Sequence, residues 1–65
     1  MSIGKKIRIY LIENGLSQKW LAEKTNIALP KLNASLNEKR KLPADEFVSI
    51  ISILNVDANT FIKNE

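Results

Sequence analysis

Apolar residues recur along most of the chain at every third or fourth position, the spacing that places them on one face of an α-helix. The first such face consists of Ile3, Ile7, Tyr10 and Leu11. Gly15 follows these residues, and glycine commonly ends a helix because it adopts the left-handed conformation without strain. The pattern therefore predicts a first helix that ends near Gly15.

A second, shorter helix is predicted after Ser17. The serine hydroxyl is suited to cap a helix N-terminus, and Trp20, Leu21 and Thr25 follow on a helix of about eight residues. Asn26 stands where this helix must stop, and asparagine is the non-glycine residue that best tolerates the left-handed conformation. We therefore expect a sharp turn at Asn26.

Pro30 marks the start of a third helix, because proline is tolerated in the first turn and breaks a helix further along. The helix is accordingly expected to begin near Ala28 or Leu29. Leu32 and Leu36 then follow at i and i+4 and are expected to form its inward face.

Two further helices are predicted in the last third of the chain. The polar run NEKRKL (37–42) indicates a loop, and Pro43 is expected to open a fourth helix. Its apolar face is made of Phe47, Ile50, Ile51 and Leu54. Asp57 is suited to cap a last short helix that runs through Phe61 and Ile62.

No segment alternates between apolar and polar residues as a half-buried strand would. The sequence also contains no internal repeat and no linker long enough to separate domains. We therefore predict an all-α protein of five helices that forms a single domain over residues 1–65.

The composition argues against enzymatic and metal-binding chemistry. The 65-residue chain contains no cysteine and no histidine, so it lacks thiolate ligands, disulfides and the commonest general base. A core of this size is also too small to enclose a substrate pocket. The sequence therefore predicts a protein that is not an enzyme and needs no metal, no cofactor and no small-molecule ligand.

Hydropathy gives no sign of a membrane segment. No apolar run approaches the roughly 18 residues that a transmembrane helix needs. The first residues also lack the apolar core of a signal peptide. The expectation is a cytoplasmic protein without membrane contact.

Basic residues gather in the first two-thirds of the chain. Residues 1–41 hold nine of the ten Lys and Arg residues against three acidic residues, a net charge of +6. Residues 42–65 hold one lysine against four acidic residues, a net charge of −3. This distribution favours either a polyanion bound on one face or a simple excess of solvated lysines.

A capped helix, a short turn and a second helix between Ser17 and Leu36 are typical of a helix-turn-helix, whose second helix enters the DNA major groove. The segment GLSQKWLAEKTNIALPKLNASLNEKRKLP (15–43) resembles the Cro/CI-type, lambda-repressor-like (XRE) family, and ILNVDANTFI (53–62) is similar to the family's closing segment. The resemblance covers residues 3–62. It implies a compact five-helix lambda-repressor-like domain whose helices two and three form the helix-turn-helix, at about residues 17–37.

The chain departs from the family pattern at four places. Asn26 replaces the turn glycine, and Ala28 replaces the usual Ser or Thr cap of the recognition helix, so no cap hydroxyl is available there. Leu11 and Leu36 replace a charged pair between the first and third helices, and we expect an apolar contact instead. Glu38 replaces the glycine of the following loop.

The resemblance implies a DNA interface in which Gln18 approaches a phosphate and the tip of the third helix approaches base edges. The candidate interface comprises Ser17, Gln18, Ala28, Leu29, Pro30, Lys31, Asn33, Ala34, Asn37, Lys39, Arg40 and Lys41. Ala28, Leu29, Pro30 and Ala34 occupy base-edge positions, where apolar side chains contact thymine methyl groups. Direct base readout by these residues is limited, so DNA shape is expected to contribute.

Several of these residues allow two interpretations. The run Lys39–Lys41 is either a clamp on backbone phosphates or a solvated loop. Lys31 either reaches a guanine or a phosphate, or is simply exposed. Asn33 and Asn37 are either base readers or ordinary surface residues of the helix, and Trp20 either stacks on a base or supports the core.

Two functions follow from this resemblance. The first is a sequence-specific DNA-binding transcriptional regulator, of the phage or mobile-element repressor type, that binds double-stranded DNA at an inverted repeat as a weak or DNA-dependent homodimer. The alternative is a protein-binding antirepressor module on the same fold, because the apolar tip Ala28–Pro30 would also suit a protein partner.

Overall fold

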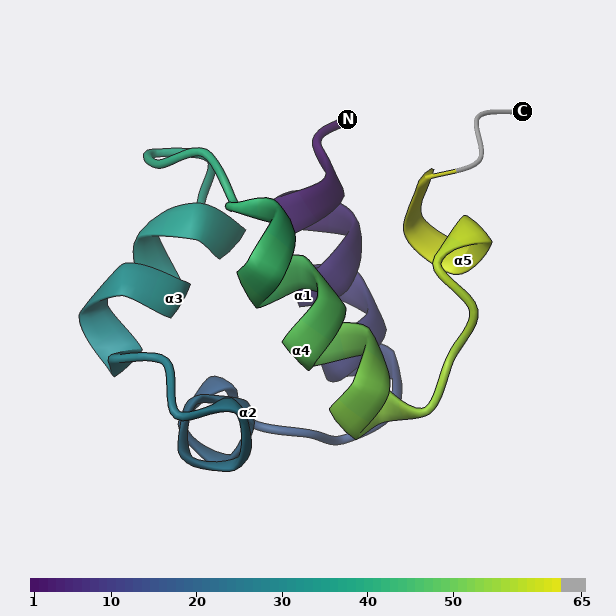
Figure 1. The fold of residues 1–65 in the computed structure, drawn as a ribbon, viewed down its shortest axis with the longest axis horizontal. Coiled ribbons are helices and arrows are strands. Elements are labelled where there is room, and N and C mark those ends of the chain that lie inside the picture. The colour runs from purple at the N-terminus through teal and green to yellow at the C-terminus, as the bar shows by residue number, and fades with distance from the viewer. Residues whose placement is uncertain (63–65) are drawn as a thin grey trace.

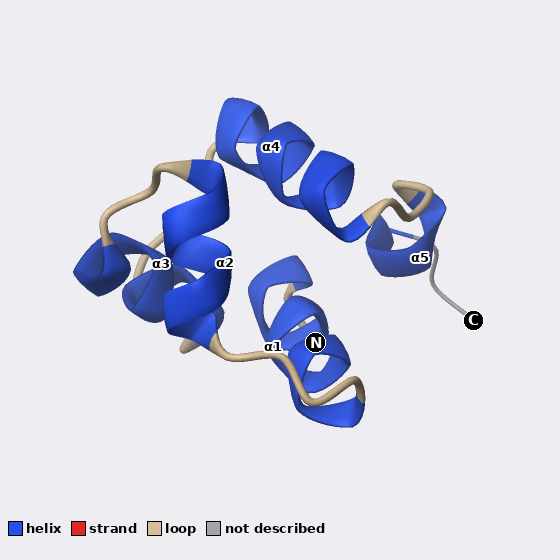
Figure 2. Ribbon diagram, turned by 90° about the horizontal axis from the view of Figure 1, so that it is seen from below, coloured by secondary structure: helices blue, strands red, loops and turns tan. Residues whose placement is uncertain are grey.

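The computed structural model describes residues 1–62, and within that range it consists of helices and loops without a strand (Figure 2). The helices are α1 (Ile3–Glu13), α2 (Gln18–Thr25), α3 (Leu29–Leu36), α4 (Ala44–Leu54) and α5 (Asn59–Ile62). The prediction of an all-α protein with five helices is confirmed for these residues. Lys63 and Glu65, which enter the charge of the C-terminal third, lie outside the described residues.

Contacts between pairs of helices hold the fold together. α1 contacts α3 and α5, while α2 contacts both α3 and α4. α2 and α3 consequently lie on one side of the molecule and α5 on the other (Figure 1). The arrangement leaves the outer faces of α2 and α3 open to solvent.

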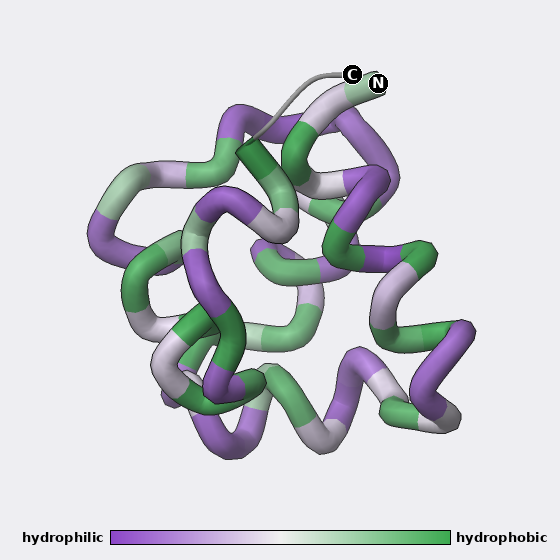
Figure 3. Tube along the Cα trace, turned by 90° about the vertical axis from the view of Figure 1, so that its right-hand side faces the viewer, coloured by the Kyte–Doolittle hydropathy of each residue, from purple (hydrophilic) through white to green (hydrophobic). Residues whose placement is uncertain are grey.

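A single apolar core joins all five helices. Its buried members are Ile7, Leu11, Leu21, Ala22, Leu32, Leu36, Ile50 and Phe61. Green hydrophobic and purple hydrophilic positions alternate along the helices in Figure 3, as the spacing of apolar residues predicts. The inward positions predicted for the third helix are confirmed, whereas on α4 Ile50 is fully buried and the other three predicted residues are half-buried around the core.

Aromatic contacts attach the last helix to the rest of the core. The rings of Tyr10 and Phe61 meet edge to face with their centroids 5.5 Å apart, and those of Phe47 and Phe61 do so at 6.4 Å. Such pairs contribute about 0.5–1.5 kcal/mol beyond the area they bury. A helix as short as α5 is therefore held by packing against α1 and α4.

The predicted helix ends are confirmed. Ser17 caps α2, because its Oγ accepts a hydrogen bond from the Trp20 backbone N–H at 2.9 Å. Asn26 ends α2 in the left-handed conformation, with φ 60° and ψ 30°. Asp57 Oδ1 accepts from the backbone N–H of Asn59 at 2.8 Å at the start of α5.

Glu38 adopts the left-handed conformation, with φ 64°, at the position where the resemblance expects glycine. Its Oε2 accepts a hydrogen bond from the Ser2 backbone N–H at 3.3 Å, and its own N–H donates to the Ser35 carbonyl at 3.2 Å. The hydrogen bond from Ser2 also lowers the pKa of the Glu38 carboxyl group. The side chain therefore ties a strained turn to the start of α1, a contact that glycine could not make.

Gly4 allows α1 and α3 to approach closely. It is buried, and a Cβ at this position would collide with the backbone carbonyl of Ser35. This role could not be predicted from the sequence, because a glycine inside an apolar-patterned helix does not indicate which other segment it meets. The close approach sets the distance between α1 and the C-terminal half of α3.

Leu11 and Leu36 both lie in the core, with 1% and 0% of their surfaces exposed. Apolar burial therefore stands where the resemblance expects a charged pair. The polar contact between the two helices lies nearby instead, where Arg8 Nη1 donates to Asn37 Oδ1 at 3.2 Å. Over residues 1–62 no helix combines the length and the apolar composition that crossing a membrane requires.

Candidate nucleic-acid interface

The start of α3 is an exposed apolar tip. Ala28 is the N-cap residue and makes no side-chain capping hydrogen bond, as its methyl group requires. Pro30 lies in the first turn, and both it and Ala28 are exposed. Leu29 retains 41% of its surface in solvent. The structure therefore presents these three residues together on the surface.

The start of α2 differs from the start of α3 in its free donors. The first residues of a helix carry backbone N–H groups without intrahelical acceptors. Ser17 satisfies one of these groups, that of Trp20, and leaves those of Gln18 and Lys19 at the open end. At α3, Pro30 has no N–H and Lys31 N–H already bonds to the Ala28 carbonyl. Of the two ends, α2 therefore offers an anion more donors.

A row of hydrogen-bonded side chains runs across the surface from α1 through α3 to α2. Arg8 Nη1 donates to Asn37 Oδ1 at 3.2 Å, Asn37 Nδ2 donates to Asn33 Oδ1 at 3.1 Å, and Asn33 Nδ2 donates to Gln18 Oε1 at 3.0 Å. We call these four residues the amide relay. Asn33 and Asn37 can bond because residues four apart lie on the same face of a helix. The relay brings together three residues of the candidate interface.

Membership of the relay changes the interpretation of the two asparagines. Both Oδ1 atoms and one N–H of each amide are engaged within the protein. Their remaining hydrogen-bonding capacity is one N–H donor each together with second lone pairs on the oxygens. Asn33 or Asn37 could contact a base only through the remaining N–H group or lone pair. The observed role of both residues is to form the relay.

Arg40 makes several contacts within the protein, and its role in a phosphate clamp stays a prediction that these contacts compete with. Its Nη1 lies 2.9 Å from Glu46 Oε1 and its Nη2 lies 3.1 Å from Glu46 Oε2, a two-pronged ion pair. Nη1 also donates to Ser35 Oγ at 2.9 Å, and Ser35 is buried. Arg40 therefore joins the end of α3 to the first turn of α4.

The charges of this pair affect each other's ionisation. The hydrogen bond and the charge of Arg40 lower the pKa of Glu46, and Lys31 contributes in the same direction. The hydrogen bonds that Arg40 donates to the Glu46 carboxylate likewise raise the pKa of Arg40. Since the guanidinium charge is already neutralised by a carboxylate, Arg40 has little left to offer a phosphate. We call Ser35, Arg40 and Glu46 the loop clasp.

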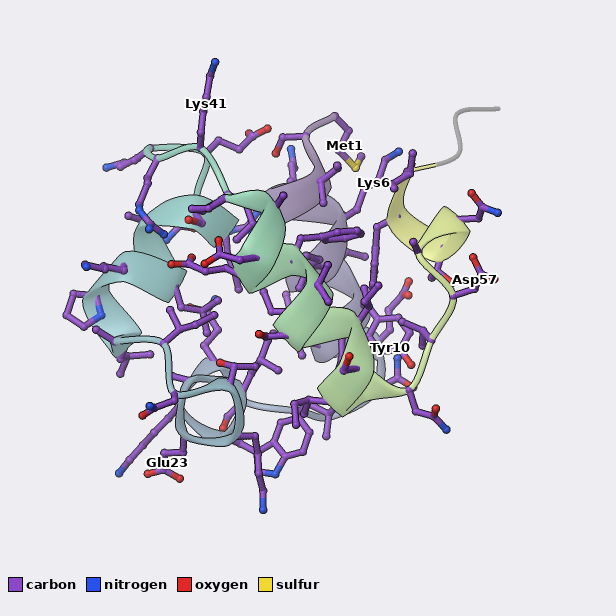
Figure 4. The ribbon with its side chains drawn as sticks, viewed as in Figure 1. Met1, Lys6, Tyr10, Glu23, Lys41 and Asp57 are labelled. Carbon is purple, nitrogen blue, oxygen red and sulfur yellow. The ribbon has the colours of Figure 1, made fainter. Side chains whose placement is uncertain are left out.

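The three lysines of the candidate interface remain exposed. Lys31 lies in α3 just after the apolar tip, whereas Lys39 and Lys41 lie in the loop that follows α3. Lys41 extends away from the body of the molecule in Figure 4. The positive charge of Lys31 contributes to the lowered pKa of Glu46, in the first turn of α4.

Ser17, Ala34 and Trp20 are the remaining residues that the sequence suggested for DNA binding. Ser17 uses its hydroxyl as a helix cap, and Ala34 is half-buried within α3. Trp20 is half-buried and packs against the core, which supports its interpretation as a core residue and not as a base-stacking platform. Two residues of the site were not predicted from the sequence. Arg8 anchors the relay, and Glu46 forms an ion pair with Arg40.

The chain matches none of the known protein families, characterised proteins or solved structures with which it was compared. The function is therefore inferred from the geometry of the chain's own residues.

Proposed function

We propose that this chain is a DNA-binding transcriptional regulator of Cro/CI type, in which α2 and α3 form a helix-turn-helix. The observation that carries the proposal is the unit formed by α2, the left-handed Asn26 and α3, whose outer face is open to solvent. In such a unit the second helix lies in the major groove and the first crosses the phosphate backbone. The type of regulator proposed is a repressor of a phage or mobile element.

Phosphate contacts are assigned to residues around the ends of both helices. Gln18 stands at the start of α2, and Lys39 and Lys41 lie in the loop after α3. Each lysine that neutralises a phosphate releases condensed counterions, which makes the affinity depend on salt. Arg40 is left out of this set because Glu46 already binds its guanidinium group.

Base contacts are assigned to the exposed first turn of α3. Leu29 and its neighbours Ala28 and Pro30 contact thymine methyl groups, and Lys31 contacts a guanine or a phosphate. Because these residues make few polar contacts, direct base readout is modest. Sequence-dependent DNA shape supplies the remaining specificity. Two copies bind an inverted repeat, with half-site centres one helical turn apart, about 34–36 Å.

One observation favours a second candidate, the protein-binding antirepressor. Leu29 is 41% exposed and is flanked by Ala28 and Pro30, so the tip of α3 is an apolar surface. Apolar surface of this kind also suits a protein partner. DNA remains the first choice because Lys31 follows the tip directly, Lys39 and Lys41 are exposed in the loop after α3, and the amide relay between them ends in donors.

Binding to random-sequence duplexes over a range of salt concentrations tests the proposal. The double variant Lys39→Gln/Lys41→Gln is expected to reduce the slope of log affinity against log salt by about 0.9 for each phosphate that is no longer neutralised. It should weaken binding to all sequences by similar factors, because phosphates carry no sequence information. The matched control is Lys24→Gln, in the last turn of α2 and outside the candidate interface.

Two results would contradict the proposal. An unchanged slope in the double variant would remove Lys39 and Lys41 from the interface. No duplex binding by the unaltered protein, even at low salt, would favour the protein-partner function instead.

A further inference from the structure

The amide relay has a direction, and one residue sets it. An amide can present either its oxygen or its NH2 group to a neighbour, but an arginine guanidinium has donors and no acceptor. Asn37 must therefore turn its Oδ1 toward Arg8, which leaves its Nδ2 for Asn33. Asn33 is turned in the same sense and donates to Gln18 Oε1.

The direction determines what the last member of the relay shows to solvent. Because Gln18 Oε1 accepts from Asn33, its Nε2 group points the other way, and this group has no acceptor among residues 1–62. The relay therefore ends in free N–H donors. If Arg8 were absent, both asparagines and Gln18 could invert together, and the oxygen of Gln18 would be presented instead.

We infer that Arg8 is a positioning residue that holds the Gln18 amide with its donors outward, toward a phosphate oxygen of bound DNA. The inference rests on the proposed function and adds a residue of α1 to it. Phosphate oxygens accept hydrogen bonds and never donate them, so an outward NH2 group binds them and an outward carbonyl oxygen repels them. Arg8 acts through Asn37 and Asn33 and needs no contact with the DNA.

An unpaired donor of Arg8 supports this role over a purely structural one. Its Nε is buried and has no hydrogen-bond partner within residues 1–62. A buried donor without a partner lowers stability, so Arg8 is held in place at some cost to the fold. Residues that cost stability are concentrated at functional sites.

A double-mutant cycle between Arg8 and Gln18 tests the inference through duplex affinity. Arg8→Met is expected to weaken binding by between about 2-fold, when the two orientations are equally populated, and about 10-fold, the value of one hydrogen bond. In a Gln18→Met background the same substitution should have only the small effect of losing a charge, because no amide remains to be oriented. An equal loss in both backgrounds would overturn the inference.

Arg8→Lys is the matched control, since lysine also donates without accepting. It is expected to retain most of the affinity. The salt slope gives a second criterion, because Arg8→Met should leave it unchanged if Arg8 makes no phosphate contact. A slope reduced by about 0.9 would show that Arg8 binds phosphate itself, which would contradict the positioning role.

The orientation of the relay can also be measured by NMR in the free protein, without DNA. A through-hydrogen-bond coupling between Asn33 Nδ2 and the side-chain carbonyl carbon of Gln18 is expected in the unaltered protein and should weaken in Arg8→Met, where both orientations of the relay are accessible. Its absence from the unaltered protein would overturn the inference whatever the protein binds. Its presence without duplex binding would uphold the orientation and contradict the DNA function, so the two failures are distinguishable.

Discussion

Arg8 and Arg40 both bind polar side chains near the C-terminal end of α3, but their partners differ in kind. Arg40 meets the carboxylate of Glu46, so its charge is neutralised within the protein. Arg8 meets the neutral amide of Asn37, which passes the hydrogen-bonding direction on to the next side chain. The loop clasp is therefore closed, whereas the amide relay ends in free donors on the surface.

The comparison shows that a basic residue in a binding motif cannot be assigned from its charge alone. Lys39, Arg40 and Lys41 form one basic run in sequence, yet the middle residue belongs to the loop clasp. Arg8 stands outside every motif of the sequence and anchors the candidate interface. Whether a basic side chain can bind a ligand depends on the chemical type of the partner that it meets within the folded protein.

Leu36→Ala is expected to have the largest effect, because Leu36 lies between Ser35 of the clasp and Asn37 of the relay. It is fully buried, and removing a buried leucine side chain costs roughly 2–5 kcal/mol. Chemical denaturation measures the loss. Leu29→Ala serves as control, since Leu29 is exposed and its change should be within about 0.5 kcal/mol. A loss at Leu36 no larger than the control would contradict this account of the core.

Gly4→Ala is expected to have the second largest effect on stability, because Gly4 packs against Ser35 of the loop clasp. The added Cβ collides with the Ser35 carbonyl, and overpacking of this kind costs about 1–3 kcal/mol. Gly15→Ala is the comparison, because Gly15 has open space around it and only the strain of its φ of +65°. If thermal denaturation showed Gly15→Ala to be the more damaging, the close approach of α1 and α3 would be wrong.

Substitutions at Asn26 test the turn that sets the orientation of α3 relative to α2. Asn26→Val should destabilise by about 1–2 kcal/mol, because a branched side chain is disfavoured in the left-handed conformation. Asn26→Gly should be tolerated, since glycine adopts this conformation freely. The two variants are compared by their denaturation midpoints. Equal stability of both would mean that Asn26 does not hold a left-handed backbone in solution.

The smallest effect is expected from the ion pair of the clasp, and it should depend on pH. The folded-state pKa of Glu46 lies below its unfolded value, so the pair stabilises the fold above the unfolded pKa. This contribution is lost as pH falls through the lowered folded value, in the acid range below about 4.3. The difference in stability between the unaltered protein and Glu46→Gln should thus shrink on acidification.

The control for this pH dependence is Asp45→Asn, which removes a charge from the same turn of α4 without breaking the clasp. Its stability difference from the unaltered protein should vary less over that range. A Glu46→Gln difference that stayed constant from neutral to acid pH would show that the ion pair does not contribute to folding.

Local signals made much of the fold predictable. The cap at Ser17, the stop at Asn26 and the proline at the start of α3 each follow from the conformational preference of one residue type. The buried face of α3 follows from the period of Leu32 and Leu36. These features depend on a few neighbouring residues, so a single sequence carries them.

Contacts between distant segments were not predictable in the same way. Glu38 adopts a glycine-like conformation and bonds to Ser2, a residue that lies 36 positions away in sequence. The pairing of Arg40 with Glu46 and that of Arg8 with Asn37 depend on how α3 is placed against α4 and α1. Hydrophobic period predicts which face of a helix is buried, but it does not identify the polar neighbour at the edge of that face.

The most direct measurement is the change in backbone amide NMR signals when a random-sequence duplex is added at low salt. We predict shifts at Gln18, through the first turn of α3 and at Lys39 and Lys41, with no shift in α5, on the opposite side of the molecule (Figure 1). Shifts confined to α5, or no shifts at any duplex concentration, would contradict the claim that the open face of α2 and α3 binds DNA.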